Sequence, residues 1–257
     1  MTMTDMTGKT VVVTGASKGI GAAIVKSLGA SGANIVAHYA SDRTGAEDAV
    51  AGIAEDRRTL IQADFANPVE ADAFWARAEE WQGRIDVLVT NAAVMRIGGG
   101  IEAPDSEWDD VWDEAWRINV LSPARLMRNA VRSFEPSGGG VIICISSWAA
   151  NRGASNPDSI AYAASKAAIT AAAKTIARAY ATKNILTYLV SPGVVRTRMS
   201  EDFAASHGGE EAITAGLQMK EWIPPEDLGE LVAFLATGKV RHLTGATIDV
   251  NGASYVR

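Results

Sequence analysis

Short runs of apolar, largely β-branched residues recur along the chain and alternate with longer segments in which apolar residues return at helical spacing. Runs that are apolar almost throughout are typical of strands covered on both faces of a sheet. They lie at 10–13, 34–39, 58–62, 85–90, 141–146, 185–191 and 246–250. The segments between them predict helices near 19–31, 43–56, 68–82, 106–134, 159–182 and 225–237.

This alternation of strand and helix predicts a parallel sheet joined by right-handed crossovers. We therefore expect an α/β fold: a Rossmann-type, doubly wound sheet of about seven strands with helices on both faces. The glycine triplets at 98–100 and 138–140 fall at strand–helix junctions, so residues 1–257 are expected to form one domain. The long stretch 194–224 lacks a clear strand and is expected to be a substrate lid.

Composition narrows the possible functions. With 257 residues, 47% of them hydrophobic and 21% charged, the chain can bury a full core. A net charge of −6 without a basic cluster disfavours nucleic-acid binding. No apolar run reaches the roughly 18 residues of a membrane span, so a cytoplasmic protein that does not bind membranes is expected. Cys144 is the only cysteine, which excludes a disulfide framework.

Glycines cluster at residues 14–21, directly after the first predicted strand and at the start of the first predicted helix. Gly15, Gly19 and Gly21 allow a tight turn and a close approach of the backbone to a pyrophosphate, whose charge the helix N-terminus stabilises. Their GxxxGxG spacing differs from the commoner GxGxxG. The alternative is a loop of glycines that binds no ligand.

Tyr162 and Lys166 lie four residues apart on the predicted helix 159–182, so both side chains project from one face. A cation near a phenol favours its ionised form and lowers a pKa that starts near about 10. Tyr162 can then exchange a proton at neutral pH. The alternative is a solvated pair on the helix surface.

Five motifs in the same order resemble those of the short-chain dehydrogenase/reductase family, and the resemblance covers almost the whole chain. They are TGxxxGxG at 14–21, Asp64 after the third strand, Asn91-Ala92-Ala93, the tetrad Asn119, Ser147, Tyr162 and Lys166, and Pro192-Gly193 followed by Thr197. The departures are Ala93 in place of a glycine, Asn251-Gly252-Ala253 in place of Asp-Gly-Gly, and a Ser147 that lies 15 residues before Tyr162, two more than is usual.

The resemblance implies hydride transfer between a nicotinamide and a carbonyl or alcohol carbon. Tyr162 would be the general acid or base, and Lys166 would hold the nicotinamide ribose and lower the pKa of Tyr162. Ser147 would donate a hydrogen bond to the substrate oxygen, and Asn119 would anchor a water that links Lys166 to solvent.

Two of these assignments have alternatives. Ser146 lies beside Ser147, but strand alternation sends the two hydroxyls to opposite faces, and the family's functional serine is normally the second. Asn119 can instead distort a long helix by bonding to backbone, which is compatible with its catalytic role. We favour Ser147 and Asn119.

The resemblance also assigns residues to the dinucleotide, with Asp64 contacting the adenine. They are Gly15, Ser17, Lys18, Gly19, Ile20, Gly21, Ala40, Ser41, Arg43, Asp64, Phe65, Asn91, Ala92, Tyr162, Lys166, Pro192, Gly193, Val195 and Thr197.

Cofactor choice depends on the end of the second strand, where an acidic residue would accept the ribose hydroxyls of NAD. We place Ala40 at that position, so nothing there repels a 2′-phosphate, and Lys18, Ser41 and Arg43 can bind one. NADP is therefore expected over NAD. The alternatives are that Lys18 and Arg43 are solvated surface charges, or that a slip of one or two residues makes Asp42 an NAD-selecting acid.

Trp108, Trp112 and Trp116 recur every four residues and form one helical stripe, which is typical of a core or a subunit interface. The resemblance implies that the helices carrying Asn119 and Tyr162 pair between subunits. A homotetramer is therefore expected.

The three histidines are His38, His207 and His242. They show no metal-ligand spacing, and each is expected to be an ordinary loop or surface residue. No metal site is expected.

The substrate is expected to be a small carbonyl or alcohol compound bound under the lid. Apolar residues able to close the lid are Met199, Phe203, Leu217, Met219 and Trp222, and acidic residues at its rim are Glu201, Asp202, Glu210 and Glu211. The acidic rim discourages strongly anionic substrates.

Two substrate classes and one function of a different kind remain open. A 3-oxoacyl reductase would need a basic surface to dock an acyl carrier protein, and Lys183 together with the uncharged segment 137–140 supplies only half of it. The polar loop at 148–158 would suit a sugar or polyol. A regulator that senses NADP without catalysis would not need the tetrad, whose presence disfavours it.

Overall fold

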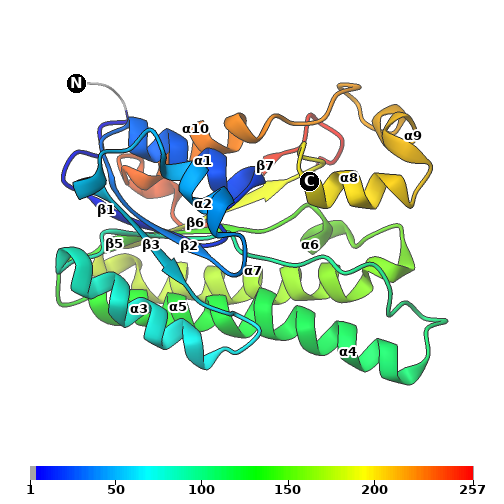
Figure 1. Ribbon diagram of the computed structural model, residues 1–257, viewed down its shortest axis with the longest axis horizontal. Coiled ribbons are helices and arrows are strands. Elements are labelled where there is room, and N and C mark those ends of the chain that lie inside the picture. Colours follow the sequence, from blue (N-terminus) through cyan, green and yellow to red (C-terminus); the bar gives the residue numbers. More distant parts are fainter. Residues whose placement is uncertain (1–3, 257) are drawn as a thin grey trace.

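The computed structural model describes residues 4–256. Within this range the centre is a sheet of seven parallel strands in the order β3-β2-β1-β4-β5-β6-β7 (Figure 1). The strands are β1 (Thr10–Val13), β2 (Asn34–Tyr39), β3 (Arg58–Gln62), β4 (Val87–Thr90), β5 (Gly140–Ile145), β6 (Ile185–Pro192) and β7 (Thr247–Val250). The order reverses between β1 and β4, where sheets of this kind bind ligands at the carboxyl ends of their strands. The expected fold is confirmed.

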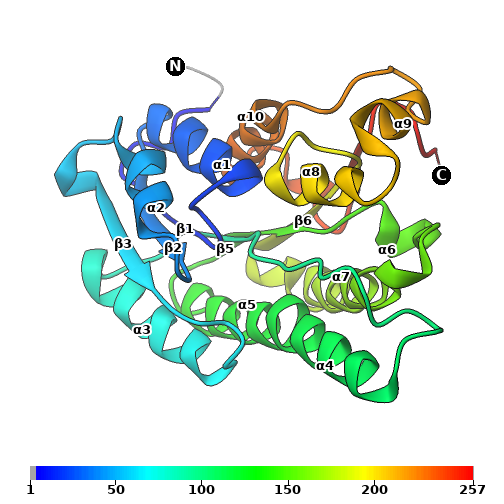
Figure 2. The same cartoon turned by 45° about the vertical axis from the view of Figure 1, so that its right-hand side comes forward.

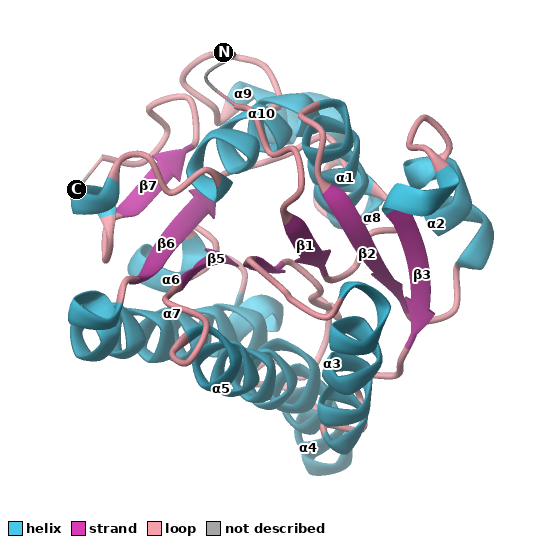
Figure 3. Ribbon diagram, turned by 90° about the vertical axis from the view of Figure 1, so that its left-hand side faces the viewer, coloured by secondary structure: helices cyan, strands magenta, loops and turns pink. Residues whose placement is uncertain are grey.

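Helices cover both faces of the sheet (Figures 2 and 3). One face carries α1 (Gly19–Ala30), α2 (Arg43–Val50) and α10 (Pro225–Ala236), and the other carries α3 (Val69–Gln82), α5 (Ser122–Phe134) and α7 (Ile160–Tyr180). Successive side chains of β1 enter opposite cores: Val11 and Val13 pack with the first group and Val12 with the second. The strands read as unbroken runs of apolar residues, without alternation, because both faces of the sheet are buried.

The predicted helix 106–134 is one long rod with a widened turn in it. Helix α4 (Asp105–Trp116) runs into a π-helical turn (Arg117–Leu121), which continues as α5. A π turn inside an α-helix often marks a functional site. Asn119 lies in this turn.

The prediction of a helix over 43–56 is wrong in its second half. Helix α2 ends at Val50, and only a 3₁₀ turn at Glu55–Arg57 follows before β3. Gly52 is a weak helix former, and Ile53 turns inward against Gly29 of α1. The Arg58 guanidinium donates to the Val50 carbonyl at 2.7 Å and so satisfies the helix end.

The segment 194–224 forms two short helices, α8 (Arg198–Ala205) and α9 (Gly209–Ala215). A single parallel bridge pairs Val195 with Ile223 and closes the segment at its base. Figure 1 places α8 and α9 at the same end of the molecule as the short helix α6 (Ala149–Arg152), which follows β5. Among residues 4–256, none of the helices has the length and apolar character needed to cross a membrane.

Candidate active site

The glycine turn, residues 14–21, joins β1 to α1 and is tied to the end of β4. The Thr14 hydroxyl donates to the Val89 carbonyl at 3.3 Å and accepts from the backbone N–H groups of Asn91 and Ala92 at 2.9 and 3.0 Å. The Asn91 amide in turn donates to the carbonyls of Thr14 and Gly15 at 2.9 and 3.1 Å. Asn91 and Ala92 therefore fix the shape of the turn.

The geometry of the glycine turn fits a pyrophosphate. Gly15 has a φ of 65°, which strains any residue with a side chain, and a Cβ on Gly21 would collide with the Gly15 carbonyl. Lys18 is the N-cap residue of α1 and its side chain makes no capping bond. The first N–H groups of α1 therefore keep their capacity to bind an anion.

Tyr162 and Lys166 project from one face of α7 toward the end of β5, as their spacing predicts. The Lys166 Nζ donates to the Ile145 carbonyl at 2.9 Å and lies 5.9 Å from the centre of the Tyr162 ring. The Ser147 side chain lies close enough to the Tyr162 hydroxyl to lower the pKa of the phenol. Three of the four tetrad residues thus meet at the carboxyl edge of the sheet.

Lys166 is not among the groups that shift the pKa of Tyr162 in this structure. Burial raises the pKa of Tyr162, and the nearby Ser147 side chain opposes this only in part. Burial also lowers the pKa of Lys166 from 10.5 to about 8, with Cys144 opposing the change. The ammonium is held by a backbone carbonyl and not by the phenol, so it does not promote ionisation of Tyr162 in this arrangement.

Asn119 joins three parts of the site from the π turn. Its Oδ1 accepts from the Val94 N–H at 2.9 Å, and its Nδ2 donates to the Val94 carbonyl at 2.9 Å and to the Ser165 hydroxyl at 3.0 Å. The side chain thus bonds to the backbone of the loop after β4 and not to its own helix. Both amide hydrogens are used, which leaves one lone pair of Oδ1 for a water.

The two serines after β5 have different surroundings, as alternation predicts. The Ser146 hydroxyl pairs with the Thr170 hydroxyl of α7 at 2.6 Å inside the core. The Ser147 hydroxyl accepts from the Ala149 N–H at 3.2 Å and reaches Tyr162. This geometry favours Ser147 as the serine that meets a substrate.

The corner that would select the cofactor carries one carboxylate shortly after β2, that of Asp42. The strand ends at Tyr39, one residue before the expected Ala40, and neither side chain is acidic. The Asp42 carboxylate accepts from the Gly45 N–H at 2.9 Å and caps α2. Arg43 is exposed and pairs with Glu47 at 2.8 Å.

The remaining predicted cofactor residues lie on neighbouring loops. The methyl group of Thr197 packs against Gly19, which places the segment after β6 beside the glycine turn. Val195 is buried, and Phe65 is buried after β3 next to an exposed Asp64. The set is completed by exposed Lys18 and Ser41, by partly buried Ser17, Ile20 and Gly193, and by buried Pro192 at the end of β6.

Sequence reasoning missed the role of His38. The expectation of a loop or surface residue is wrong: His38 is buried in β2 and bonds to the glycine turn. A polar side chain inside an apolar strand was the available signal. His207 is half-buried, and His242 is exposed as expected. No cluster of metal-ligating side chains occurs in the described part of the chain.

The predicted lid has a core of its own. Trp148, which follows Ser147, packs with Ala204, Leu217 and Trp222 of the segment 194–224. The Asn156 amide and the His207 Nε2 lie 2.7 Å apart and form a hydrogen bond between the loop 148–158 and the turn after α8. The loop that carries Ser147 and the lid are therefore in direct contact.

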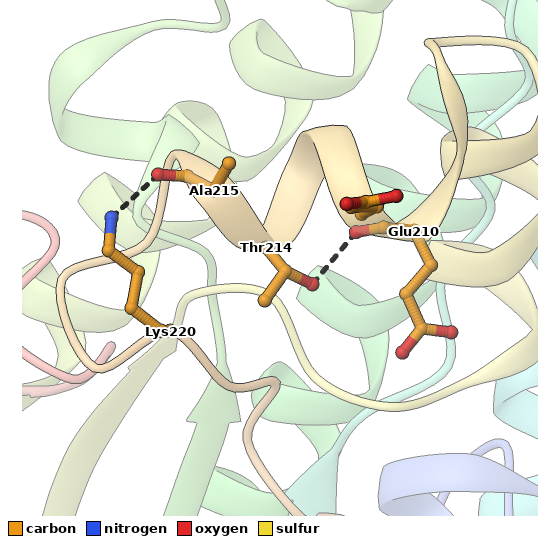
Figure 4. Close-up of a pocket in the computed structure, with 5 residues that line it drawn as sticks. Glu210, Thr214, Ala215 and Lys220 are labelled. Carbon is orange, nitrogen blue, oxygen red and sulfur yellow. Dashed lines mark hydrogen bonds between the residues drawn. The ribbon is translucent and has the colours of Figure 1, made fainter.

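A hollow of about 520 Å³ lies beside α9 in the predicted lid, and Figure 4 shows residues that line it. Its walls include Thr214, which donates to the Glu210 carbonyl at 2.7 Å, and Lys220, which donates to the Ala215 carbonyl at 2.7 Å. None of its lining residues belongs to the tetrad or the glycine turn. The hollow therefore lacks the groups that the expected chemistry needs.

Known proteins share this architecture. The family model described as Enoyl-(Acyl carrier protein) reductase matches residues 15–253. Oxidoreductase UcpA of Salmonella typhimurium is 33% identical over 258 residues, covering 98% of this chain and 96% of that protein. The 3beta-hydroxysteroid dehydrogenase 1 of Eggerthella lenta is 34% identical over 257 residues, covering 96% of this chain and 94% of that protein.

A solved structure gives the same result. The short chain dehydrogenase from Burkholderia cenocepacia J2315, in complex with NADP, superposes with a TM-score of 0.86 at 32% identity, covering 97% of this chain and 99% of that chain. The chain therefore belongs to the short-chain dehydrogenase/reductase family. It is an NAD(P)-dependent oxidoreductase.

Proposed function

We propose that the protein transfers a hydride between NADP(H) and a carbonyl or secondary alcohol, with Tyr162 as the general acid or base. One observation carries the proposal: Tyr162, Ser147 and Lys166 meet beside a glycine turn shaped for a pyrophosphate. One relative is named a hydroxysteroid dehydrogenase, which fits a secondary alcohol as substrate for a site of this kind.

The chain offers matching groups for both ends of the dinucleotide. The glycine turn and the N-terminus of α1 would hold the pyrophosphate, and Asp64 would hold the adenine. Lys166 would hold the nicotinamide ribose. The bound cofactor supplies or accepts the hydride, and the protein supplies orientation and the proton.

In reduction, Tyr162 would donate its proton to the oxygen of the substrate, and Ser147 would hold that oxygen by a second hydrogen bond. A raised pKa keeps the Tyr162 proton in place until charge develops on the oxygen. Lys166 would then have to leave the Ile145 carbonyl for the ribose and the phenolate. A water at Asn119 would return the proton from solvent.

NADP is favoured over NAD by the corner at the end of β2. The residue at the expected position is Ala40, and the Asp42 carboxylate nearby accepts from the Gly45 N–H at the start of α2. Lys18 and Arg43 approach the same corner, since the Ser17 carbonyl lies against Gly45 of α2. Arg43 would exchange its pairing with Glu47 for a 2′-phosphate.

The substrate class remains divided between a 3-oxoacyl group and a sugar or polyol. A docking surface for an acyl carrier has little support, because Lys183 pairs with Glu135 at 2.9 Å. The exposed side chains of Asn151, Arg152 and Ser155 in the loop 148–158 favour a hydroxylated substrate. That observation supports a sugar or polyol as the second candidate substrate.

A homotetramer is the proposed assembly. Trp116 and Leu121 are 41% and 42% exposed on the rod formed by α4, the π turn and α5, whereas Trp108 and Trp112 pack on each other. Two exposed large apolar side chains on the same helical rod suit contact with a second copy. Light scattering of the purified protein measures the number of subunits, and a monomer would contradict the proposal.

The decisive experiment is a screen of 3-oxoacyl esters, ketoses and polyols that follows NADPH absorbance, with Tyr162→Phe as the matched variant. The variant keeps the ring and loses only the proton, so its rate should fall about 10²- to 10⁴-fold with little change in NADPH affinity. A variant that retains more than about a tenth of the rate would exclude Tyr162 as the acid. Tight NADPH binding without turnover of any compound would instead indicate a sensor.

A further inference from the structure

His38 connects two loops of the expected cofactor site, although it lies inside a strand. It is the residue before the last in β2, where it pairs with Ile61 of β3 and is 2% exposed. Its own carbonyl accepts from the Ala16 N–H at 2.8 Å. Its backbone is thus already bonded to the glycine turn.

The imidazole adds one hydrogen bond to the glycine turn and one to the segment after β3. Its Nδ1 accepts from the Gly15 N–H at 2.9 Å, and its Nε2 lies 3.0 Å from the Ala63 carbonyl. A backbone N–H can only donate and a carbonyl can only accept, so Nδ1 is unprotonated and Nε2 carries the hydrogen. Both bonds therefore require the neutral ring in one tautomer.

Aromatic packing holds the ring in this position. His38 stacks on Phe65 with the ring centres 4.0 Å apart and the planes 5° apart, and Phe74 of α3 meets it edge-on at 5.2 Å. Phe65 follows Asp64, the residue expected at the adenine. The ring therefore spans from the glycine turn to the segment 63–65.

The surroundings keep the ring neutral. Burial lowers the pKa of His38 to about 4, and the positive charge of Arg77 lowers it further. The hydrogen bond to Ala63 and the negative charge of Asp64 raise the pKa and offset part of this shift. An apolar side chain here would leave the N–H of Gly15 and the carbonyl of Ala63 without these partners. Buried polar groups without partners would destabilise the present conformation of the glycine turn.

We propose that His38 is a positioning residue that holds the glycine turn and the segment 63–65 at the spacing that the adenosine and pyrophosphate half of the cofactor requires. The proposal rests on the proposed NADP(H) function. His38 itself would touch neither substrate nor nicotinamide. Its loss should therefore reduce cofactor affinity and leave the chemical step intact.

The test compares His38→Phe with the wild type and with Tyr188→Phe. The first variant keeps an aromatic ring and loses both hydrogen bonds. The second loses one hydrogen bond, from Tyr188 to the Val240 carbonyl at 3.2 Å, at a buried position in β6 away from the glycine turn. It controls for a general loss of stability.

NADPH titration by fluorescence should give a Kd about tenfold higher for His38→Phe, equivalent to about 1.4 kcal/mol, and an unchanged Kd for Tyr188→Phe. The kcat at saturating NADPH should stay within about twofold of the wild type. Without cofactor, the amides of Gly15 and Ala16 should exchange hydrogen faster in His38→Phe only. An unchanged Kd, or a lower kcat with unchanged Kd, would overturn the proposal.

If His38→Phe does not fold, His38→Asn takes its place, because Asn keeps a short acceptor for Gly15 and loses the ring stack. A Kd about threefold higher supports the proposal, and a wild-type Kd refutes it. Failure of the wild type to bind NADPH or NADH would refute the proposed function instead, and the hydrogen-exchange result would still report on the His38 bonds.

Discussion

Lys166 should make the fold less stable at neutral pH, because its ammonium is buried. Its pKa is 10.5 in the unfolded chain and about 8 in the fold. Between these values the unfolded chain binds more protons, so this group makes the free energy of unfolding rise with pH from about 8 to 10.5. The full difference corresponds to about 3 kcal/mol of destabilisation at pH 7.

The substitution Lys166→Met separates this penalty from the bond that Lys166 makes. It removes the buried charge but leaves the Ile145 carbonyl without its 2.9 Å partner, which costs about 1–3 kcal/mol. The two effects oppose each other, so at pH 7 the variant should be as stable as the wild type or more stable by up to about 2 kcal/mol. It should nevertheless be inactive.

Urea unfolding at pH 7.0 and pH 9.5, at one protein concentration, measures both effects. The lost bond counts equally at both pH values, whereas the charge penalty of the wild type falls by about 2 kcal/mol between them. The variant should therefore lose about 2 kcal/mol relative to the wild type on going to pH 9.5. Lys26→Met, on the exposed side of α1, controls for loss of a surface lysine. A difference that is the same at both pH values would refute the buried-charge argument.

Two further predictions concern the cofactor corner and the lid. Replacing Lys18 and Arg43 together with Ala should weaken NADPH binding at least about tenfold more than NADH binding, because a 2′-phosphate loses charge-assisted bonds. Equal losses for both cofactors would place the phosphate elsewhere. In hydrogen exchange, the amides of 200–220 should gain protection only when NADPH and substrate are both present, since a closing lid excludes water. Protection equal to that of α7 in the free protein would make the segment a fixed part of the fold.

Strand positions were predictable because the sheet is buried on both faces. All seven apolar runs became strands, and β1, β2 and β3 keep their predicted bounds. The fourth strand begins at Val87 and not at 85, because the Asp86 carboxylate accepts from the Thr10 N–H at 3.1 Å. A hydrogen bond from a side chain to a neighbouring strand cannot be predicted from the pattern of apolar residues.

The candidate site was predictable in its residues but not in its electrostatics. The spacing of Tyr162 and Lys166 placed both on one face of α7, yet it could not indicate that burial raises the pKa of one and lowers that of the other. The sequence left open whether Asn119 bonds to its own helix, and the structure shows that it reaches Val94 instead. Such contacts depend on which loops the fold brings together.

The interior position of β1 in the sheet has a consequence for how the chain is made. The hydrogen-bond partner of Thr14 is Asn91, which lies 77 positions later in the sequence. Beyond β4, the next two positions in the sheet are filled by β5 and then β6. A growing chain on the ribosome therefore exposes an incomplete sheet, with an edge that still lacks its partner strand, until β7 has emerged. We expect products of premature termination before residue 247 to depend on chaperones and to be degraded quickly.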